Sequence, residues 1–334
     1  MAESINMAAS GILGTGSSIP EKILTNADLE KMVETSDDWI TKRTGIKERH
    51  ILEKNQPAYK MAAEASRKAV ADAGLAASDI ELIIFATVTP DYLTPSMASI
   101  IQNEIGAVNA ATFDLNAACS GFVYGMVTAS QFIRCGTYKY ILVVGCEALS
   151  KVTDWQDRNT CILFGDGAGA VVMGTVQEGF GLLSWKLGSD GRMGRNITIP
   201  CMYINEEDKL FRTHSKEQVV WMDGSEVFKF AVRIMAQTTE EVLSGTGISL
   251  NDLRLIIPHQ ANIRIIDGAI KRLGIEASKV YVNVPRYGNT GAASLAVALD
   301  EAASGGMIEK GDYFVLVGFG GGLTWASSLI RWAK

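Results

Sequence analysis

One cysteine of this sequence has the surroundings of a nucleophile. Cys119 lies in FDLNAACSGFVYG, residues 113–125, where a strand-like run ends near Leu115 and a helical run continues to about Arg134. The small residues around it would allow a sharp strand-to-helix turn and the close approach of a substrate carbonyl. A position at a helix N-terminus lowers a thiol pKa below its usual ~8.5 and raises the thiolate fraction. We therefore predict a nucleophile, although a buried core cysteine is the commoner role.

Two further polar residues lie where they could act on a substrate held by that cysteine. His259, in LIIPHQAN, directly follows the strand-like run Leu255 to Ile257, and active sites of parallel α/β structures gather at the carboxyl ends of strands. Asn289, in RYGNTGAAS, lies in a glycine-flanked turn before the helical run 292–303. Taken singly, His259 could equally be a structural histidine, and Asn289 an ordinary helix cap.

A glycine-rich segment, GFGGGLTW at 318–325, follows the last strand-like run and could present backbone N–H groups to a ligand oxygen. A phosphate-binding loop is the competing interpretation, but no Lys-Ser/Thr pair follows these glycines. Near the N-terminus, Gly11, Gly14 and Gly16 have the wrong spacing for a dinucleotide-binding fingerprint. The sequence therefore gives little support to nicotinamide or P-loop chemistry.

The elements that must position these residues occur twice. GLAASDIELII at 74–84 matches GISLNDLRLII at 247–257, and CGTYKYILVVG at 135–145 matches KGDYFVLVG at 310–318, both at an offset close to 173 residues. Two matches in the same order at the same offset predict a duplicated domain.

Each copy contains a helical run followed by a short apolar strand. Lys60–Ala73 precedes a strand at 79–85, and Val227–Leu243 precedes a strand at 253–257. Strands that are apolar on both faces and alternate with helices predict largely parallel sheets covered by helices on both sides. The predicted fold class is a layered α/β molecule made of two such halves.

The composition is that of a globular protein. The 334 residues are 47% hydrophobic and 20% charged, and 31 basic against 37 acidic residues give a net charge of −6. This balance argues against general nucleic-acid binding. The longest apolar runs, such as Leu82–Val88, fall far short of the ~20 residues of a membrane span, and the N-terminal MAESINMAASG lacks the features of a secretory signal. We expect a soluble cytoplasmic protein.

The remaining cysteines and histidines suggest neither a disulfide framework nor a metal site. No two of the five cysteines form a CxxC motif, and the three histidines are scattered along the chain. We interpret the other four cysteines as core residues: Cys135, Cys146, Cys161 and Cys201. The histidines are His50, His214 and His259.

Taken together, AACSGF, PHQAN, GNTGAAS and GFGGGLTW, in this order along the chain, resemble the β-ketoacyl-acyl carrier protein synthase III family. The similarity covers essentially the whole chain. It implies the thiolase fold, in which duplicated α/β halves form a five-layer αβαβα architecture, and a homodimer. We divide the chain accordingly into residues 1–177, which carry Cys119, and residues 178–334, which carry His259 and Asn289.

The resemblance also implies the reaction. Cys119 would take an acyl group from an acyl-CoA, and His259 with Asn289 would handle decarboxylation of a malonyl-acyl carrier protein, giving a 3-ketoacyl-acyl carrier protein at the start of fatty acid biosynthesis. The backbone N–H groups of Cys119 and Gly321 would hold the oxyanion, and neutral donors suit the developing enolate. Thiolases carry a second cysteine and elongating synthases two histidines, so His plus Asn favours the initiating class. Coenzyme A enters as a thioester substrate; no cofactor or metal is implied.

Further positions match the family's substrate sites. For coenzyme A, the resemblance implies adenine stacking by Trp39, with Arg158 on the other face of the adenine, and phosphate contact by Arg43. Asn159 replaces a glycine that is common beside that arginine. The full coenzyme A and pantetheine set is Trp39, Arg43, Thr44, Arg158, Gly224, Phe228, Ala261 and Asn262.

The acyl pocket and a carrier-protein surface complete the expected site. By resemblance, Thr94 reaches across the dimer interface to the end of the partner's acyl pocket near Leu149 and Phe164, where many acetyl-using members carry phenylalanine. Threonine would leave room for several methylenes, so we predict tolerance of primers longer than acetyl. On a helix starting near Asn262, helical spacing places a basic cluster on one face, which would attract an acidic carrier protein. Its members are Arg264, Lys271 and Arg272, with Lys229 added by resemblance.

Other interpretations remain open at this point. The first is a related thiolase-fold condensing enzyme of secondary metabolism with an unusual acyl donor. A cysteine hydrolase would share Cys, His and Asn, but the duplicated fold and the coenzyme A positions weigh against it. A non-catalytic module that binds acyl carriers would leave the three polar residues unexplained. Residues 189–216 match the family least well and receive no assignment.

Overall fold

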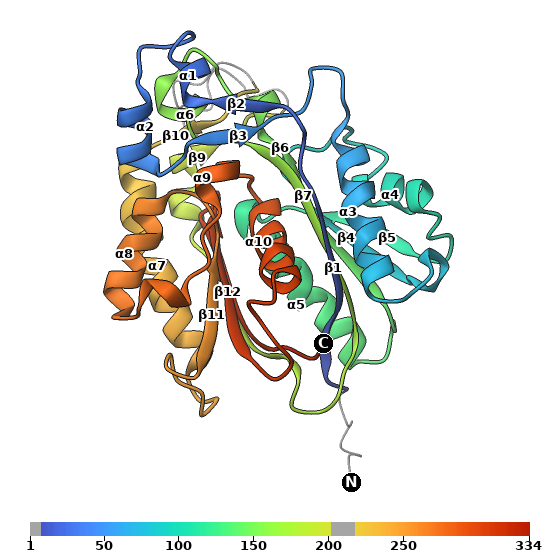
Figure 1. The fold of residues 1–334 in the computed structure, drawn as a ribbon. Helices are drawn as coiled ribbons and strands as arrows, with labels where there is room; N and C mark the ends of the chain where they lie inside the picture. Colours follow the sequence, from blue (N-terminus) through green and yellow to red (C-terminus); the bar gives the residue numbers. More distant parts are fainter. Residues whose placement is uncertain (1–7, 202–217) are drawn as a thin grey trace.

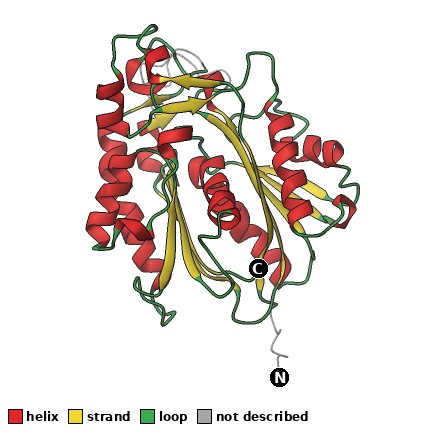
Figure 2. Ribbon diagram, in the orientation of Figure 1, coloured by secondary structure: helices red, strands yellow, loops and turns green. Residues whose placement is uncertain are grey.

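Alternating layers of helices and sheets form the body of the computed structural model, which describes residues 8–201 and 218–334 (Figures 1 and 2). Two sheets stand side by side with a helical layer between them and one outside each (Figure 1). The middle layer contains α5 (Gly121–Arg134) and α10 (Ala293–Ser304). The outer layers are α3 (Ala58–Asp72) with α4 (Met97–Ile105), and α7 (Gly224–Leu243) with α8 (Ile263–Leu273). This is the five-layer αβαβα arrangement that the family resemblance implies.

The two sheets repeat one strand order. The first sheet has the order β1-β7-β6-β4-β5 and the second the order β8-β13-β12-β11. The strands of the first are β1 (Ser10–Ser18), β4 (Leu82–Ala86), β5 (Ala111–Leu115), β6 (Ile141–Ala148) and β7 (Asp166–Thr175). Those of the second are β8 (Gly181–Ser189), β11 (Leu253–Pro258), β12 (Tyr313–Gly320) and β13 (Thr324–Arg331). The repeated segments of the sequence therefore occupy equivalent strands, β4 with β11 and β6 with β12.

The prediction of largely parallel sheets is wrong in part. β4 pairs in parallel with β5 and β6, and β11 with β12, but β1–β7, β6–β7, β12–β13 and β8–β13 are antiparallel. Local apolar patterns do not distinguish the two, because a strand buried on both faces looks the same in either direction. The parallel strands are the ones whose carboxyl ends lead into the candidate site.

Most element boundaries agree with the sequence within a few residues. The predicted helix Lys60–Ala73 is α3, and its stop residue Gly74 adopts a positive φ of 69°. The predicted strand at 79–85 begins later, because residues Ala77–Asp79 form a 3-10 turn. The glycine-rich segment 318–325 is not a long loop, since β12 extends to Gly320 and β13 begins at Thr324.

A cap of short elements covers one end of the two sheets (Figure 1). Its strands are β2 (Ile23–Thr25), β3 (Glu48–His50), β9 (Ile197–Thr198) and β10 (Trp221–Met222). Its helices are α1 (Asn26–Leu29), α2 (Asp37–Thr44), α6 (Arg158–Cys161) and α9 (Val284–Tyr287). A buried apolar cluster that includes Ile40, Leu149, Phe164 and Ile266 joins this cap to the layers below.

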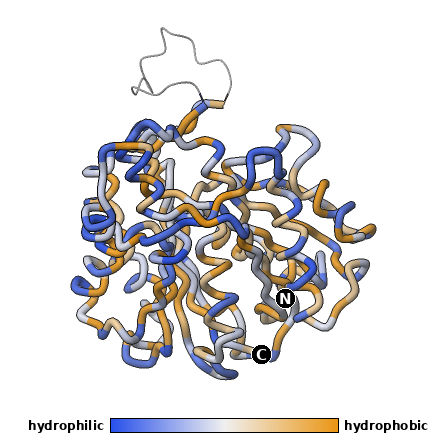
Figure 3. The backbone as a smooth tube through the Cα atoms, turned by 45° about the horizontal axis from the view of Figure 1, so that its top comes forward, coloured by the Kyte–Doolittle hydropathy of each residue, from blue (hydrophilic) through white to orange (hydrophobic). Residues whose placement is uncertain are grey.

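The core lies in the strands and the middle helices. Every residue of β4 and β6 is buried, and α5 and α10 pack between the sheets. Hydrophilic stretches lie largely on outer turns and loops (Figure 3). In the part of the chain that the structure describes, no helix combines the length and the apolar character of a membrane span. His214 and residues 202–216 of the unassigned segment lie outside the described residues.

Candidate active site

Cys119 lies in a sharp turn between β5 and α5. β5 ends at Leu115, and residues Ala118–Ser120 form one 3-10 turn before α5 begins at Gly121. Ala118 has a φ of +46°, a region that non-glycine residues rarely adopt and that marks a strained elbow. Ser120 stabilises the turn, because its hydroxyl donates to Ala117 O at 2.7 Å and its Oγ also contacts Thr324 Oγ1 at 2.8 Å. The elbow predicted from the small residues is thus present.

The electrostatic setting of Cys119 differs from the expectation. Cys119 is partly exposed. Desolvation by the protein around it and, second, the negative charge of Glu147 nevertheless raise the pKa of the thiol to about 12, while its backbone hydrogen bond lowers it. The 3-10 turn separates the sulfur from the first α-helical residue, and the surrounding desolvation outweighs any benefit of the helix end. The resting side chain is therefore a neutral thiol, which must lose its proton during attack.

The glycines at the end of β12 contact the cysteine backbone. A Cβ atom at Gly320 would lie 2.5 Å from Cys119 N, and one at Gly318 would lie 3.5 Å from Cys119 O. Gly321 follows within the turn, where its carbonyl accepts from Thr324 Oγ1 at 3.1 Å. Gly320 is therefore the residue that must lack a side chain here, a role that the sequence analysis did not assign individually.

His259 directly follows β11 and is 1% exposed. Its backbone N–H donates to Val317 O at 2.8 Å, and its ring meets the edge of Phe319 with centroids 5.3 Å apart. Its Nδ1 lies 2.5 Å from Ser294 Oγ on α10. Burial lowers the pKa of His259 to about 3, so the imidazole is neutral at physiological pH. The next residue, Gln260, was not singled out from the sequence; its Oε1 accepts from the backbone of Asn283 and Val284.

Asn289 lies in the turn between α9 and α10 and is 8% exposed. Its backbone N–H donates to Leu163 O at 2.8 Å, and its backbone carbonyl accepts from Gly165 N at 3.0 Å. The side-chain Oδ1 accepts from Gly291 N at 2.9 Å. Because the oxygen is used within the turn, the amide nitrogen is the end of the side chain that can donate to a substrate.

Glu147, in β6, is a functional candidate that the sequence analysis missed. It is fully buried, and its carboxylate accepts from Thr89 Oγ1 at 2.6 Å and from Val88 N at 3.1 Å. Burial raises its pKa to about 7, against these hydrogen bonds and one from the Ala292 backbone. A Cβ at Gly291 would come 2.6 Å from Glu147 Cγ. A lone carboxylate within the apolar run ILVVGCEAL was the signal that could have identified it.

Trp39, in the cap, contacts two arginines. The guanidinium carbon of Arg43 is 4.6 Å from the indole centroid, and that of Arg158 is 4.9 Å away. Arg158 also donates to Glu34 O at 3.0 Å. Thr44, in contrast, is 2% exposed, and its hydroxyl donates to Ile40 O at 2.7 Å. Three of the expected coenzyme A residues therefore meet at one surface. Thr44 is instead the buried last residue of α2.

The expected pantetheine positions adjoin that surface. Asn262 caps α8 and donates to Arg43 O at 3.1 Å, which joins α8 to α2. Ala261 is buried beside it. Gly224 is the first residue of α7, and Phe228 lies one turn further. The guanidinium carbon of Arg264 is 5.6 Å from the centroid of the Phe228 ring. These contacts join α6 to α2, α2 to α8, and α8 to α7.

The acyl-pocket residues lie in two places. Leu149 and Phe164 are buried in the cluster under the cap, and Phe164 pairs with Asn289 in an isolated β-bridge. Thr94 instead lies in the exposed loop between β4 and α4, beside Tyr92 and Leu93, which are 55% and 63% exposed. Within one chain, Thr94 is part of the surface.

The four expected docking residues are all exposed on α7 and α8. Arg264 lies in the first turn of α8, and Lys271 and Arg272 lie in its last turn. Asp267, also exposed, falls between them, and Lys229 forms an ion pair with Glu226 at 2.7 Å. The helix therefore presents cations at both ends and an anion in the middle.

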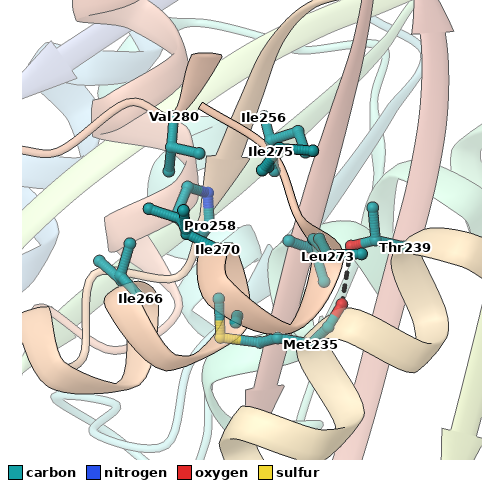
Figure 4. Close-up of a pocket in the computed structure, with 11 residues that line it drawn as sticks. Met235, Thr239, Ile256, Pro258, Ile266, Ile270, Leu273, Ile275 and Val280 are labelled. Carbon is teal, nitrogen blue, oxygen red and sulfur yellow. Dashed lines mark hydrogen bonds between the residues drawn. The ribbon is translucent and has the colours of Figure 1, made fainter. Parts of the chain in front are cut away.

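One small apolar pocket lies behind the site, between α7, α8 and β11 (Figure 4). Its walls include Met235, Ile256, Pro258 and Ile270, and Thr239 donates its hydroxyl to Met235 O at 2.7 Å. None of the candidate site residues lines it, and we interpret it as a packing gap. Among residues 8–201 and 218–334, no three His, Cys, Asp or Glu side chains are arranged to bind a metal ion.

The repeated strand order, the helical layer shared by the two sheets and the cysteine elbow define an enzyme of the thiolase fold. Comparison with known proteins shows which family within this fold the chain resembles. Residues 113–191 match the family 3-Oxoacyl-[acyl-carrier-protein (ACP)] synthase III, and residues 243–332 match its C-terminal family. A Beta-ketoacyl-[acyl-carrier-protein] synthase III of Caldanaerobacter subterraneus is 53% identical over 98% of both chains.

Solved structures agree with this. A 3-oxoacyl-[acyl-carrier-protein] synthase III of Aquifex aeolicus is 42% identical, with a TM-score of 0.90 over 97% of this chain and 100% of that chain. The corresponding synthase of Thermus thermophilus is 43% identical, with a TM-score of 0.92 over 96% and 99%. The chain belongs to the β-ketoacyl-acyl carrier protein synthase III family.

Proposed function

We propose that this protein condenses an acyl-CoA primer with a malonyl-acyl carrier protein, with loss of CO2, to give a 3-ketoacyl-acyl carrier protein that initiates fatty acid biosynthesis. One observation carries the proposal for this chain: a neutral buried His259 and the Asn289 turn accompany the Cys119 elbow. The same reaction requires no metal or resident cofactor, because coenzyme A arrives as the thioester substrate.

In the first half-reaction, the sulfur of Cys119 attacks the acyl-CoA carbonyl. A bond forms between Sγ and the acyl carbon, the bond to the coenzyme A sulfur breaks, and the thiol proton ends on the departing coenzyme A. The backbone N–H groups of Cys119 and Gly321 stabilise the oxyanion. The high pKa of the thiol makes proton loss part of this step rather than a property of the resting enzyme.

In the second half-reaction, His259 and Asn289 bind the malonyl thioester oxygen. As the bond to the carboxylate breaks and CO2 leaves, negative charge develops on that oxygen, and two neutral donors stabilise it in a water-poor site. The enolate carbon then attacks the acyl-Cys119 carbonyl and expels the cysteine sulfur as a thiolate, which takes up one proton from solvent to restore the resting thiol. Asn289 supplies its amide N–H, because its side-chain oxygen already accepts from Gly291 N.

The surface of α2, α6 and α8 binds the carriers in this proposal. Trp39, Arg43 and Arg158 bind the nucleotide end of coenzyme A, and Gly224, Phe228, Ala261 and Asn262 line the pantetheine arm. In this structure Arg158 covers the indole at 4.9 Å, so an adenine ring must displace it to stack there. Lys229, Arg264, Lys271 and Arg272 attract the acidic carrier protein.

A homodimer and a two-half chain belong to the same proposal. β5 is the edge strand of the first sheet, and α4 packs against it. Exposed apolar residues lie in the loops before and after α4, namely Tyr92, Leu93 and Val108. Pairing of two copies there would bring Thr94 to the partner's acyl pocket. Residues 1–177 would then carry the first sheet, which ends at Thr175, and residues 178–334 the second, which begins at Gly181. A cytoplasmic location suits the reduced thiol that the reaction needs.

Incubation with radiolabelled acyl-CoA and malonyl-acyl carrier protein tests the function. We expect an acyl adduct on Cys119 by intact-protein mass spectrometry, followed by a labelled 3-ketoacyl-acyl carrier protein. Release of free fatty acid without condensation would instead identify a hydrolase. Binding of both substrates without turnover would identify a non-catalytic module.

A further inference from the structure

A serine on the central helix α10 contacts the catalytic histidine. Ser294 is 2% exposed and lies in the first turn of α10, with its Oγ 2.5 Å from His259 Nδ1. The backbone N–H of Gln260 donates to the same Oγ at 3.4 Å. Within the described part of the chain, these are the two hydrogen-bond partners of the Ser294 hydroxyl.

The directions of these two bonds follow from the groups involved. A backbone N–H can only donate, so the Gln260 contact uses an acceptor lone pair of the hydroxyl and leaves its proton free. His259 Nδ1 is the remaining partner that can accept this proton. The opposite arrangement, with Nδ1–H donating to Oγ, would leave a buried hydroxyl proton without an acceptor, which costs free energy.

An accepting Nδ1 carries no proton, and the neutral ring then has its proton on Nε2. Burial keeps the ring neutral, because the pKa of His259 is lowered to about 3. The edge contact with Phe319 and the backbone bond to Val317 hold the ring in place. Tautomer and orientation are therefore both set by the protein before substrate binds.

We infer that Ser294 is a positioning residue that selects the Nε2–H tautomer of His259 and so makes the histidine a hydrogen-bond donor. Only the catalytic consequence rests on the proposed function. There, an Nε2–H group stabilises the enolate oxygen, whereas an unprotonated Nε2 would repel it. The tautomer itself is a property of the free protein.

Nuclear magnetic resonance of 15N-labelled histidine tests the tautomer directly. The chain has three histidines, and His259→Ala identifies the signals of His259. His50 is an internal reference, because its Nδ1 lies 2.5 Å from Pro20 O and a carbonyl can only accept, so this Nδ1 is protonated. At pH 7 we expect an unprotonated Nδ1 and a protonated Nε2 at His259. A protonated Nδ1 at His259 overturns the inference.

Ser294→Ala tests the cause. Without the hydroxyl donor, we expect a mixture of the two tautomers, unchanged acylation of Cys119, and a kcat for condensation that falls about tenfold with little change in KM, the effect of one orienting hydrogen bond. Ser66→Ala is the matched control, since Ser66 is another buried helical serine, bonded to Ala62 O at 2.7 Å. Ser66→Ala should change neither the tautomer of His259 nor the kcat for condensation.

The outcomes separate this inference from the proposed function. A tautomer that stays the same in Ser294→Ala overturns the role of Ser294. A shifted tautomer with undiminished condensation supports that role and refutes the donor role of His259 instead.

Discussion

The centre of the proposed active site and its proposed entrance are built from different interactions. His259 and Asn289 are 1% and 8% exposed and are held by neutral hydrogen bonds from the backbone and from Ser294. At the entrance, the exposed Arg43 and Arg158 contact Trp39 through cation–π interactions. Buried polar groups have few alternative partners, whereas exposed arginines exchange partners with water at small cost. The centre is thus preorganised for chemistry, and the entrance can rearrange around its ligand.

The largest effect should follow from removing the proposed nucleophile. Cys119→Ser is expected to lower acyl transfer roughly a thousandfold or more, because a hydroxyl is far less acidic than a thiol and burial beside Glu147 disfavours the anion further. Intact-protein mass spectrometry after acyl-CoA treatment measures the adduct, and circular dichroism should show an unchanged fold. An acyl-serine formed at a comparable rate would contradict the prediction.

Removal of either donor should divide the reaction in two. His259→Ala and Asn289→Ala are each expected to preserve acylation of Cys119 and to lower condensation by about 100- to 1,000-fold, the usual effect of losing one oxyanion donor. The absence of an acyl adduct in both variants would refute this division.

The pH dependence of condensation tests whether His259 acts as a neutral donor. Because the pKa of His259 is lowered to about 3, the neutral ring persists until the pH falls towards that value. Condensation by the acylated enzyme should therefore show no loss of rate as the pH falls through ~6.5, the ordinary histidine pKa. A loss of condensation rate centred near that pH would mean that a histidine with an ordinary pKa controls the step.

A smaller effect is expected from Glu147, which lies under the centre. Its negative charge raises the pKa of Cys119, so Glu147→Gln should lower that pKa and increase the rate of alkylation by iodoacetamide severalfold near pH 8. Asp166→Asn is the control, since it removes another buried carboxylate, one that Ser150 and Leu52 hydrogen bond. Alkylation that stays constant or slows in Glu147→Gln would contradict the electrostatic assignment.

At the entrance, charge reversal should affect binding alone. Arg264→Glu with Lys271→Glu is expected to raise the KM for malonyl-acyl carrier protein roughly tenfold at low salt and to spare acylation by acyl-CoA. Lys310→Glu, exposed just before β12 at the opposite end of the strand, should have no such effect. Equal loss in both half-reactions would show that α8 contributes to the centre as well.

The last prediction concerns the acyl pocket. Thr94→Phe should reduce the specificity constants for butyryl- and octanoyl-CoA relative to acetyl-CoA, by about fourfold per excluded methylene at ~0.8 kcal/mol each. The native protein is expected to accept the longer chains. A strong native preference for acetyl-CoA that the substitution leaves unchanged would show that Thr94 does not set chain length.

Some parts of the site could be predicted and others could not. The elbow of Cys119 followed from its small neighbours, and the place of His259 followed from the end of an apolar strand. Thr44 and Glu147 show the limit. The Thr44 hydroxyl turned out to be engaged inside α2, and Glu147 joins loop 87–89 to the turn before α10, a contact between segments about 200 residues apart.

The sequence by itself determined the duplicated α/β plan, most helix and strand positions and the order of the polar residues, because these depend on apolar periodicity, turn residues and spacing within short segments. The tertiary structure alone decided which strands run antiparallel, how far β12 extends and what surrounds each ionisable group. It also reversed the expected direction of the Cys119 pKa. Desolvation and charge are properties of neighbours brought together from distant parts of the chain, and no local pattern contains them.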